Sequence, residues 1–195
     1  MPKELVLSEK LKVQGDGVIA GRGLVATELI GKDELIWSPE PEPPFVDYAA
    51  RKQIDDRVFY SQIDRDLFAK NHGDEWYLNH SCAPNCVLRD RKVIAARDIQ
   101  IGEEASYDYG LTETGILWAF WCSCGAPRCR KHVSNDDYLS ASLRKRLADY
   151  CPAHAEAQAA EASVRTVLKH GLRWRLYRFK HLIRGDKSSP QALFR

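Results

Sequence analysis

Residues 79–85 have the sequence NHSCAPN, and they carry the strongest single clue to the architecture of this chain. Polar and turn-forming residues crowd this stretch, although it directly follows the apolar run Trp76-Tyr77-Leu78. Taken alone, it is typical of a capped turn with a buried histidine, because Asn, Ser and Pro are common turn residues. A more specific interpretation depends on three further segments of the chain.

Two of these segments flank the first one and are weak signals when taken singly. Residues 21–27 have the sequence GRGLVAT, which lacks the third glycine and the following helix of a dinucleotide-binding fingerprint. Residues 102–110 have the sequence GEEASYDYG, in which Tyr107 and Tyr109 are separated by Asp108 alone. In a strand, the two tyrosines would share one face. Alone, such a pair most often reflects packing.

The third segment is the cysteine pattern C-x-C-x4-C at Cys122, Cys124 and Cys129. Three thiolates this close can reach one zinc ion, which takes four ligands in a tetrahedron at about 2.3 Å. Free core cysteines are the alternative interpretation. The fourth ligand must come from elsewhere, and the spacing leaves several groups open: Cys82, Cys86, Cys151 or a histidine.

Together, and in their order along the chain, the four segments resemble the SET-domain lysine methyltransferases with a post-SET zinc loop. The resemblance covers about residues 15–130. It implies a mainly β fold of small curved sheets, in which the segment of Asn79 and His80 passes under the loop 104–109 as a pseudoknot. It divides the chain into a SET domain (1–110), a post-SET zinc-binding segment (111–133) and a C-terminal helical extension (134–195).

The resemblance also implies an activity and its residues. S-adenosylmethionine would donate a methyl group to a lysine side chain of a protein, with Tyr109 and Tyr107 as catalytic residues and Tyr107 limiting the product to mono- or dimethyl-lysine. The cofactor would contact Gly21, Arg22, Gly23, Asn79, His80 and Tyr109. A structural zinc ion would be bound by Cys82, Cys122, Cys124 and Cys129. The candidates for the wall of the lysine channel, or for the core, are Trp118, Phe120 and Trp121.

Composition limits the number of domains and the location that we expect, but it does not identify the function. The chain has 195 residues, 44% of them hydrophobic, which suffices for one domain with a core. No signal-peptide run and no stretch near the roughly 20 apolar residues of a membrane span is present, so we expect a cytoplasmic protein, with nuclear or host-delivered locations left open. Absence of a signal also favours metal-binding cysteines over disulfides.

The charge is uneven along the chain. Residues 151–195 hold nine Lys or Arg and three acidic residues, a net +6 that leaves −4 for residues 1–150 of a chain with net charge +2. Residues 164–185 are basic and amphipathic. A helix packed on the catalytic body is the favoured interpretation, with a dimer contact, an anionic membrane surface or nucleic acid as alternatives.

Short apolar runs and turn residues predict the elements. We expect strands at 18–20, 24–26, 34–37, 58–60, 87–88 and 93–96, a tight hairpin turn at Asp90-Arg91, and a surface loop at 39–44. We expect helices at 136–150, capped by Ser134, Asn135 or Asp136, at 152–170 and at 172–183.

The most favoured function is a protein-lysine methyltransferase whose substrate is a histone, a histone-like protein or another basic protein. Two alternatives stay open: a non-catalytic zinc-stabilised binding module, and a methyltransferase that acts on a small amine or a free peptide.

Overall fold

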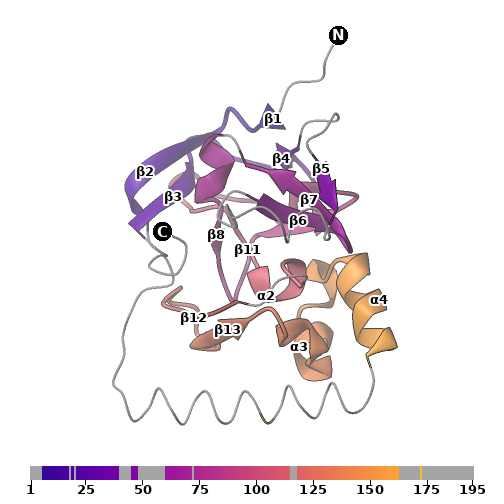
Figure 1. The fold of residues 1–195 in the computed structure, drawn as a ribbon. Helices are drawn as coiled ribbons and strands as arrows, with labels where there is room; N and C mark the ends of the chain where they lie inside the picture. Colours follow the sequence, from indigo (N-terminus) through magenta and orange to yellow (C-terminus); the bar gives the residue numbers. More distant parts are fainter. Residues whose placement is uncertain are drawn as a thin grey trace.

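The computed structural model describes residues 6–17, 19, 21–39, 45–47, 60–71, 73–114, 118–162 and 172. More of these residues lie in strands than in helices: the strands form several small sheets, and short helices lie toward the C-terminal side (Figure 1), which confirms the predicted fold class. No helix in the described part of the chain is long and apolar enough to cross a membrane.

The largest sheet has four antiparallel strands in the order β1-β4-β10-β9. Asp90 and Arg91 join the last two strands with φ angles of 50° and 63°. Two consecutive residues with positive φ form a hairpin turn whose twist suits the flanking strands, so the predicted tight turn is confirmed. The four strands are β1 (Val6–Leu7), β4 (Leu35–Ser38), β9 (Cys86–Arg89) and β10 (Lys92–Ala95).

The other sheets are smaller. One has three strands, β5 (Phe45–Asp47), β7 (Leu67–Lys70) and β6 (Tyr60–Asp64). Two antiparallel pairs are β2 (Leu11–Gly17) with β3 (Gly21–Ala26), and β12 (Ala119–Trp121) with β13 (His132–Ser134). The last pair, β8 (Asn79–His80) with β11 (Ser106–Tyr107), is parallel.

Most expected strands that fall on described residues are confirmed. The runs 24–26, 34–37, 87–88 and 93–96 lie largely in β3, β4, β9 and β10. The run 18–20 was wrong as a strand, because its described residue Ile19 lies in the turn between β2 and β3. Of the run 58–60 only Tyr60 is described, in β6, and of the loop 39–44 only Pro39.

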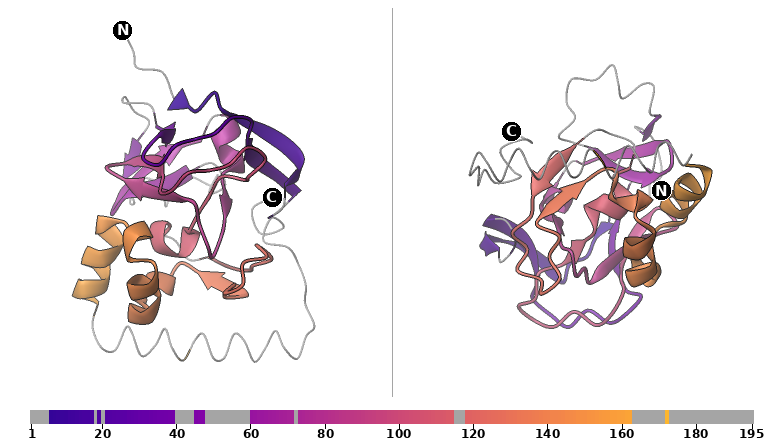
Figure 2. Two further views of the ribbon diagram at one scale, coloured as in Figure 1. Left: turned by 180° about the vertical axis from the view of Figure 1, so that it is seen from behind. Right: turned by 90° about the horizontal axis from the view of Figure 1, so that it is seen from below.

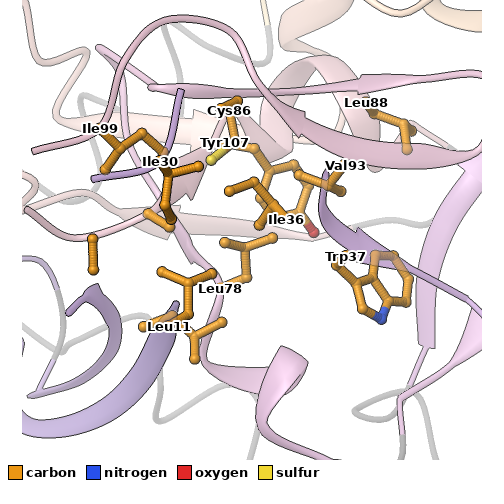
Figure 3. Close-up of a cluster of buried hydrophobic side chains, with 14 of the residues drawn as sticks. Leu11, Ile30, Ile36, Trp37, Leu78, Cys86, Leu88, Val93, Ile99 and Tyr107 are labelled. Atoms are coloured by element: carbon orange, nitrogen blue, oxygen red, sulfur yellow. The ribbon is translucent and has the colours of Figure 1, made fainter. Parts of the chain in front are cut away.

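The main hydrophobic core lies between the four-stranded sheet and the strands that face it. Ile36, Val93 and Ile99 are fully buried there, and Figure 3 shows the ring of Tyr107 among them beside Cys86. A second cluster packs Phe120 and Val133 around the cysteines, and a third joins Leu111 to Leu143 and Leu147. Tyr109 packs against both the first and the second cluster.

The single helix expected at 136–150 was wrong. This segment instead forms three short pieces: the 3-10 turns η3 (Asp137–Leu139) and η4 (Ala148–Tyr150), and the helix α3 (Ala141–Arg146) between them. Of the expected caps, Asp136 takes the N-cap position of η3 without a capping side-chain hydrogen bond, and Ser140 caps α3 by accepting a hydrogen bond from the Leu143 N–H at 3.3 Å. A capping side chain within the segment starts a new helix there.

The helix expected at 152–170 is shorter than predicted. It is α4 (Ala153–Glu161), which starts after Pro152 and ends where Ala162 adopts an extended conformation. The remainder of that prediction lies outside the described residues, as does the helix expected at 172–183 except for Leu172.

The N-terminal strands and the C-terminal helices lie on opposite sides of the molecule. Figures 1 and 2 show β1 and β2 on one side, and β12, β13, α3 and α4 on the other. The pair β8–β11 runs between the two sides (Figure 1), beside the one-turn helix α2 (Tyr109–Thr112). The predicted candidate residues gather around this central pair.

Candidate functional site

Two short parallel strands build the centre of the site. Asn79 pairs with Ser106 and His80 pairs with Tyr107, which brings together two segments that are well separated in the sequence. Asn85 holds the pair in place, because its Oδ1 accepts a hydrogen bond from the Ser106 N–H at 2.8 Å and its Nδ2 donates to the Glu104 carbonyl at 2.9 Å. Side-chain amides thus replace the further ladder bonds that such short strands lack.

Tyr109 stands where these segments meet. Its hydroxyl donates to the Leu78 carbonyl oxygen at 2.7 Å, and its backbone N–H donates to Nδ1 of His80 at 3.1 Å. Burial raises the pKa of the Tyr109 phenol, and the nearby carboxylates of Glu113 and Glu104 raise it further. The hydroxyl therefore stays neutral, and its oxygen keeps lone pairs that the Leu78 bond does not use.

Tyr107 and Tyr109 do not share a strand, although their two rings do lie together. Tyr107 ends β11, Asp108 caps the next element, and Tyr109 begins α2. The ring centroids are 4.9 Å apart. The chain turn at Asp108, and not strand alternation, brings the rings into contact.

The hydroxyl of Tyr107 already has a partner. It donates to Oε1 of Glu113 at 3.2 Å, and both carboxylate oxygens of Glu113 accept from the Gln62 N–H at 3.1 and 3.0 Å. Burial raises the pKa of Tyr107 well above its usual value, and the Glu113 charge adds to this shift. Sequence reasoning missed Glu113, which no motif marks.

The glycines nominated for the cofactor lie at the start of β3. A Cβ on Gly23 would lie 2.2 Å from Oε1 of Glu104, so only glycine fits there. That carboxylate accepts from Nδ2 of Asn79 at 2.7 Å and from the Ile19 N–H at 3.1 Å, and Asn79 Nδ2 also donates to the Arg22 carbonyl at 2.7 Å. Glu104 is a second residue whose role sequence reasoning missed, because its burial becomes visible only in the structure.

Other nominated cofactor residues frame this patch. Gly21 has a φ of 72°, which glycine adopts without strain. Arg22 is exposed, and its guanidinium lies over the Tyr77 ring at 5.7 Å and donates to the Tyr77 hydroxyl at 3.1 Å. The structure thus joins Arg22, Asn79 and Glu104 by hydrogen bonds, with Gly23 packed on Glu104 and His80 adjacent to Asn79 in β8.

The four nominated cysteines converge. The sulfur atoms of Cys82, Cys122, Cys124 and Cys129 all lie within 4.8 Å of one another, and those of Cys82 and Cys122 are 3.9 Å apart. A tetrahedral zinc site with bonds of about 2.3 Å has sulfur–sulfur distances of about 3.8 Å. Cys86 and Cys151 pack elsewhere, Cys86 in the main core and Cys151 against the Leu111 cluster.

Each of the four sulfurs accepts a hydrogen bond from one backbone N–H group. The N–H groups of Cys82, Cys124, Arg130 and Lys131 donate at 3.4 Å to the sulfurs of Cys124, Cys122, Cys82 and Cys129, respectively. Such donors stabilise thiolates, the form in which cysteine binds a metal. The donor set therefore fits a tetrathiolate metal site.

The three aromatic candidates divide into two groups. Phe120 is buried, with its ring centroid 6.2 Å from that of Tyr109 and 5.4 Å from that of His80, and Trp118 stacks on it at 5.6 Å. Trp121 contacts His132 instead, at 5.8 Å. Strand alternation in β12 separates Trp121 from Phe120, so Phe120 is the ring that lies beside Tyr109, and Trp118 stacks on Phe120.

Comparison with known proteins gives these residues a context. The family model described as "SET domain" matches residues 21–110. Histone-lysine N-methyltransferase trr of Drosophila melanogaster is 34% identical over 138 residues, which is 63% of this chain and 6% of that protein. A Schizosaccharomyces pombe protein, "Histone-lysine N-methyltransferase, H3 lysine-4 specific", is 38% identical over 95 residues, 43% of this chain and 10% of that protein.

A plant relative shows the same pattern of partial coverage. Histone-lysine N-methyltransferase ASHR3 of Arabidopsis thaliana is 38% identical over 130 residues, 58% of this chain and 26% of that protein. The chain therefore spans about a quarter or less of the length of these three relatives. The family match covers the strands and the turn that carry Gly21–Gly23, Asn79, His80, Tyr107 and Tyr109.

Proposed function

This chain belongs to the SET-domain family through residues 21–110, and on that premise we propose that it is an S-adenosylmethionine-dependent protein-lysine methyltransferase. The observation that carries the proposal is the setting of Tyr109. Its neutral hydroxyl is anchored on the Leu78 carbonyl at 2.7 Å, beside His80, Tyr107 and Phe120. The names of the similar proteins support a histone or another lysine-containing basic protein as the substrate.

Methyl transfer requires the lysine amine to be neutral, and an environment that disfavours the protonated ammonium form helps to keep it so. A free lysine has a pKa near 10.4, so holding it neutral at pH 7 costs roughly 4–5 kcal/mol in water. Apolar and aromatic surroundings disfavour the ammonium and lower this cost. Tyr107, Phe120 and Trp118 are the buried or half-buried rings that would provide such surroundings next to Tyr109.

S-adenosylmethionine would supply the electrophilic methyl group, carried on a sulfonium. The lone pairs of the Tyr109 hydroxyl oxygen would stabilise the positive charge on the transferred methyl group. The hydrogen bond from this hydroxyl to the Leu78 carbonyl fixes the direction of the lone pairs. The backbone of Gly21–Gly23, the Asn79 amide and His80 would hold the cofactor. The fit of this patch is supported by Gly23, whose missing side chain lets the backbone lie against Glu104, the carboxylate that accepts a hydrogen bond from Asn79.

We propose that Cys82, Cys122, Cys124 and Cys129 hold a structural zinc ion. The convergence of the four sulfurs and their four N–H donors support this role. Zinc in such a site contributes folding free energy directly. It would hold the segment 118–134 against Tyr109 and take no part in the methyl transfer.

The degree of methylation belongs to the same proposal. Tyr107 would limit the reaction to mono- or dimethyl-lysine, because its hydroxyl can also accept a hydrogen bond from the amine while it donates to Glu113. A methylated amine has fewer N–H groups to offer. Losing one such bond costs on the order of 1 kcal/mol, which slows a further round by about tenfold.

The test is transfer of a labelled methyl group from S-adenosylmethionine. The purified chain is incubated with core histones, a histone-like basic protein and free lysine, and the product is identified by mass spectrometry. We expect labelled lysine in a protein, and a loss on the order of a hundredfold in kcat for Tyr109→Phe with the cofactor Kd retained. Cofactor binding without transfer to any acceptor would instead identify a binding module, and transfer to free lysine alone would identify a small-amine enzyme.

A further inference from the structure

A cluster of buried charges lies between the cysteines and Tyr109. The guanidinium of Arg130 donates two hydrogen bonds to the Asp108 carboxylate, at 2.7 and 2.6 Å, and its Nε lies 3.1 Å from Oδ2 of Asp137. The Arg130 side chain is 11% exposed, and those of Asp108 and Asp137 are 1% and 5% exposed. The resemblance assigned no role to any of these three residues.

One end of this cluster is joined to the cysteines. Arg130 directly follows Cys129, and its backbone N–H donates to the sulfur of Cys82 at 3.4 Å. The position of the guanidinium is therefore set by the same segment that presents the Cys129 sulfur and contacts that of Cys82. If the four cysteines become less well ordered, the backbone of Arg130 should therefore move with them.

The other end is joined to the helix that Tyr109 begins. Asp108 caps α2, because its Oδ1 accepts from the Gly110 N–H at 3.0 Å. A Cβ on Gly110 would lie 2.8 Å from Cβ of Asp137 and 3.2 Å from Nη2 of Arg130, so the helix start packs directly on the charged cluster. The first turn of α2 therefore packs closely on the Arg130 guanidinium and on the two carboxylates, of Asp108 and Asp137, that surround it.

His80 makes a second connection between the same two places. Its Nδ1 accepts from the Tyr109 N–H at 3.1 Å, so the proton of the neutral ring lies on Nε2. That nitrogen is 3.3 Å from the sulfur of Cys82. Both connections lead from Cys82 to the backbone of Tyr109 and its neighbour, one through His80 and one through Arg130 and Asp108.

We propose that Arg130 is a positioning residue for Tyr109: it joins the cysteine cluster to the first turn of α2, so that an ordered cluster holds the tyrosine hydroxyl on the Leu78 carbonyl. The catalytic meaning of this position rests on the proposed function. The coupling itself does not, since it is a property of α2. A fork-shaped guanidinium suits the role, because it bridges two carboxylates in a fixed geometry that an ammonium cannot reproduce.

The coupling is tested by hydrogen exchange of the full chain, followed by mass spectrometry. Three variants are compared with the wild type in zinc-supplemented buffer: Arg130→Met, Arg130→Lys and the control Arg65→Met. Arg65 makes an exposed two-bond pair with Glu161, at 2.7 and 2.5 Å, away from the cysteines. Zinc content is measured in parallel.

We expect Arg130→Met to speed exchange in the peptide of residues 106–114 while the hairpin 86–95 and the zinc content are unchanged. Arg130→Lys should lie between Arg130→Met and the wild type, and Arg65→Met should match the wild type. Removal of metal from the wild type should speed exchange in the same peptide. If Arg130→Met does not fold, Arg130→Lys carries the comparison, because its ammonium still pairs with one carboxylate.

The kinetic result separates the proposal from a general loss of stability. A misplaced tyrosine should lower kcat by about tenfold to a hundredfold with little change in KM for the cofactor. Unchanged exchange at 106–114 in both Arg130 variants, or an equal effect of Arg65→Met, would overturn the coupling. A wild type that transfers no methyl group would overturn the proposed function instead, while the exchange result would still decide the coupling.

Discussion

Replacing Gly23 by alanine tests the patch at the start of β3. The new Cβ would lie 2.2 Å from Oε1 and 2.4 Å from Cδ of Glu104, whereas ordinary contacts begin at about 3.4 Å. The carboxylate must therefore retreat by about an ångström. This movement strains its two hydrogen bonds, at 2.7 Å from Asn79 and at 3.1 Å from the Ile19 N–H.

The magnitude follows from those two bonds. A hydrogen bond to a charged group contributes about 1.5–3 kcal/mol, so weakening both should lower the free energy of unfolding by about 2–4 kcal/mol. For a chain of this size, that corresponds to a fall in Tm of roughly 5–15 °C. The Asn79 amide, which bridges Glu104 and the Arg22 carbonyl, should move as well, and S-adenosylmethionine should bind about tenfold more weakly or worse.

The matched control is Gly15→Ala, in the strand that pairs with β3. A Cβ there meets nothing within 4 Å, so this variant should be as stable as the wild type or more stable by about 0.5–1 kcal/mol. Urea unfolding measures the stabilities and titration calorimetry the cofactor affinity. If Gly23→Ala unfolds and binds cofactor like Gly15→Ala, then the close packing of Glu104 on β3 has no functional role.

Three further predictions concern the metal, the product and pH. Cys122→Ser should lower bound zinc and activity together, whereas Cys151→Ser should change neither, and a wild type without zinc by elemental analysis would contradict the metal site. Tyr107→Phe should shift the product toward trimethyl-lysine with little loss in the first round, so early trimethyl-lysine from the wild type would refute the role of the hydroxyl. Burial lowers the pKa of His154 below its usual 6.5, so unfolding takes up a proton and stability should fall as pH drops below about 6.5. His154→Gln should flatten that decline, as measured by urea unfolding between pH 7 and pH 5, and an unchanged slope would exclude this histidine as the cause.

Much of the fold and site could be predicted where one short segment carries the signal. Asp90-Arg91 between two apolar runs predicted the hairpin because the turn is local. The resemblance nominated Cys82 as the fourth cysteine, and the structure places it within 4.8 Å of the other three. Spacing alone could not choose Cys82, because it lies far before Cys122 in the sequence.

The helix predicted at 136–150 shows why local patterns mislead. The segment has helical composition, yet Ser140 caps a new helix in its middle. Asp108 likewise caps a new helix, so β11 ends before Tyr109 and the two tyrosines do not share a strand. Ser and Asp side chains compete for backbone N–H groups, and a sequence does not say which of them succeeds.

The buried charges were beyond prediction for a different reason. Arg130 meets Asp108, which lies in an earlier segment of the chain, and Asp137, which lies beyond the next strand. Charged residues are mostly exposed, so an arginine in a loop of mixed polarity gives no sign that it is buried. Only the assembled pairing of β8 with β11 and of β12 with β13 places these three side chains together.

The position of Cys82 has a consequence for the order in which the chain assembles. Cys122, Cys124 and Cys129 can meet in an unfolded chain, since one short segment carries all three, but Cys82 reaches them only when a long loop closes. Closing that loop has an entropic cost that grows slowly with its length, and Cys82 follows closely on β8, whose pairing with β11 fixes its place. A nascent chain would therefore hold zinc weakly through three thiolates. If the cysteines bind zinc as proposed, tight binding would report that β8 and β11 have already paired, and metal retention would then measure folding at the centre of the molecule.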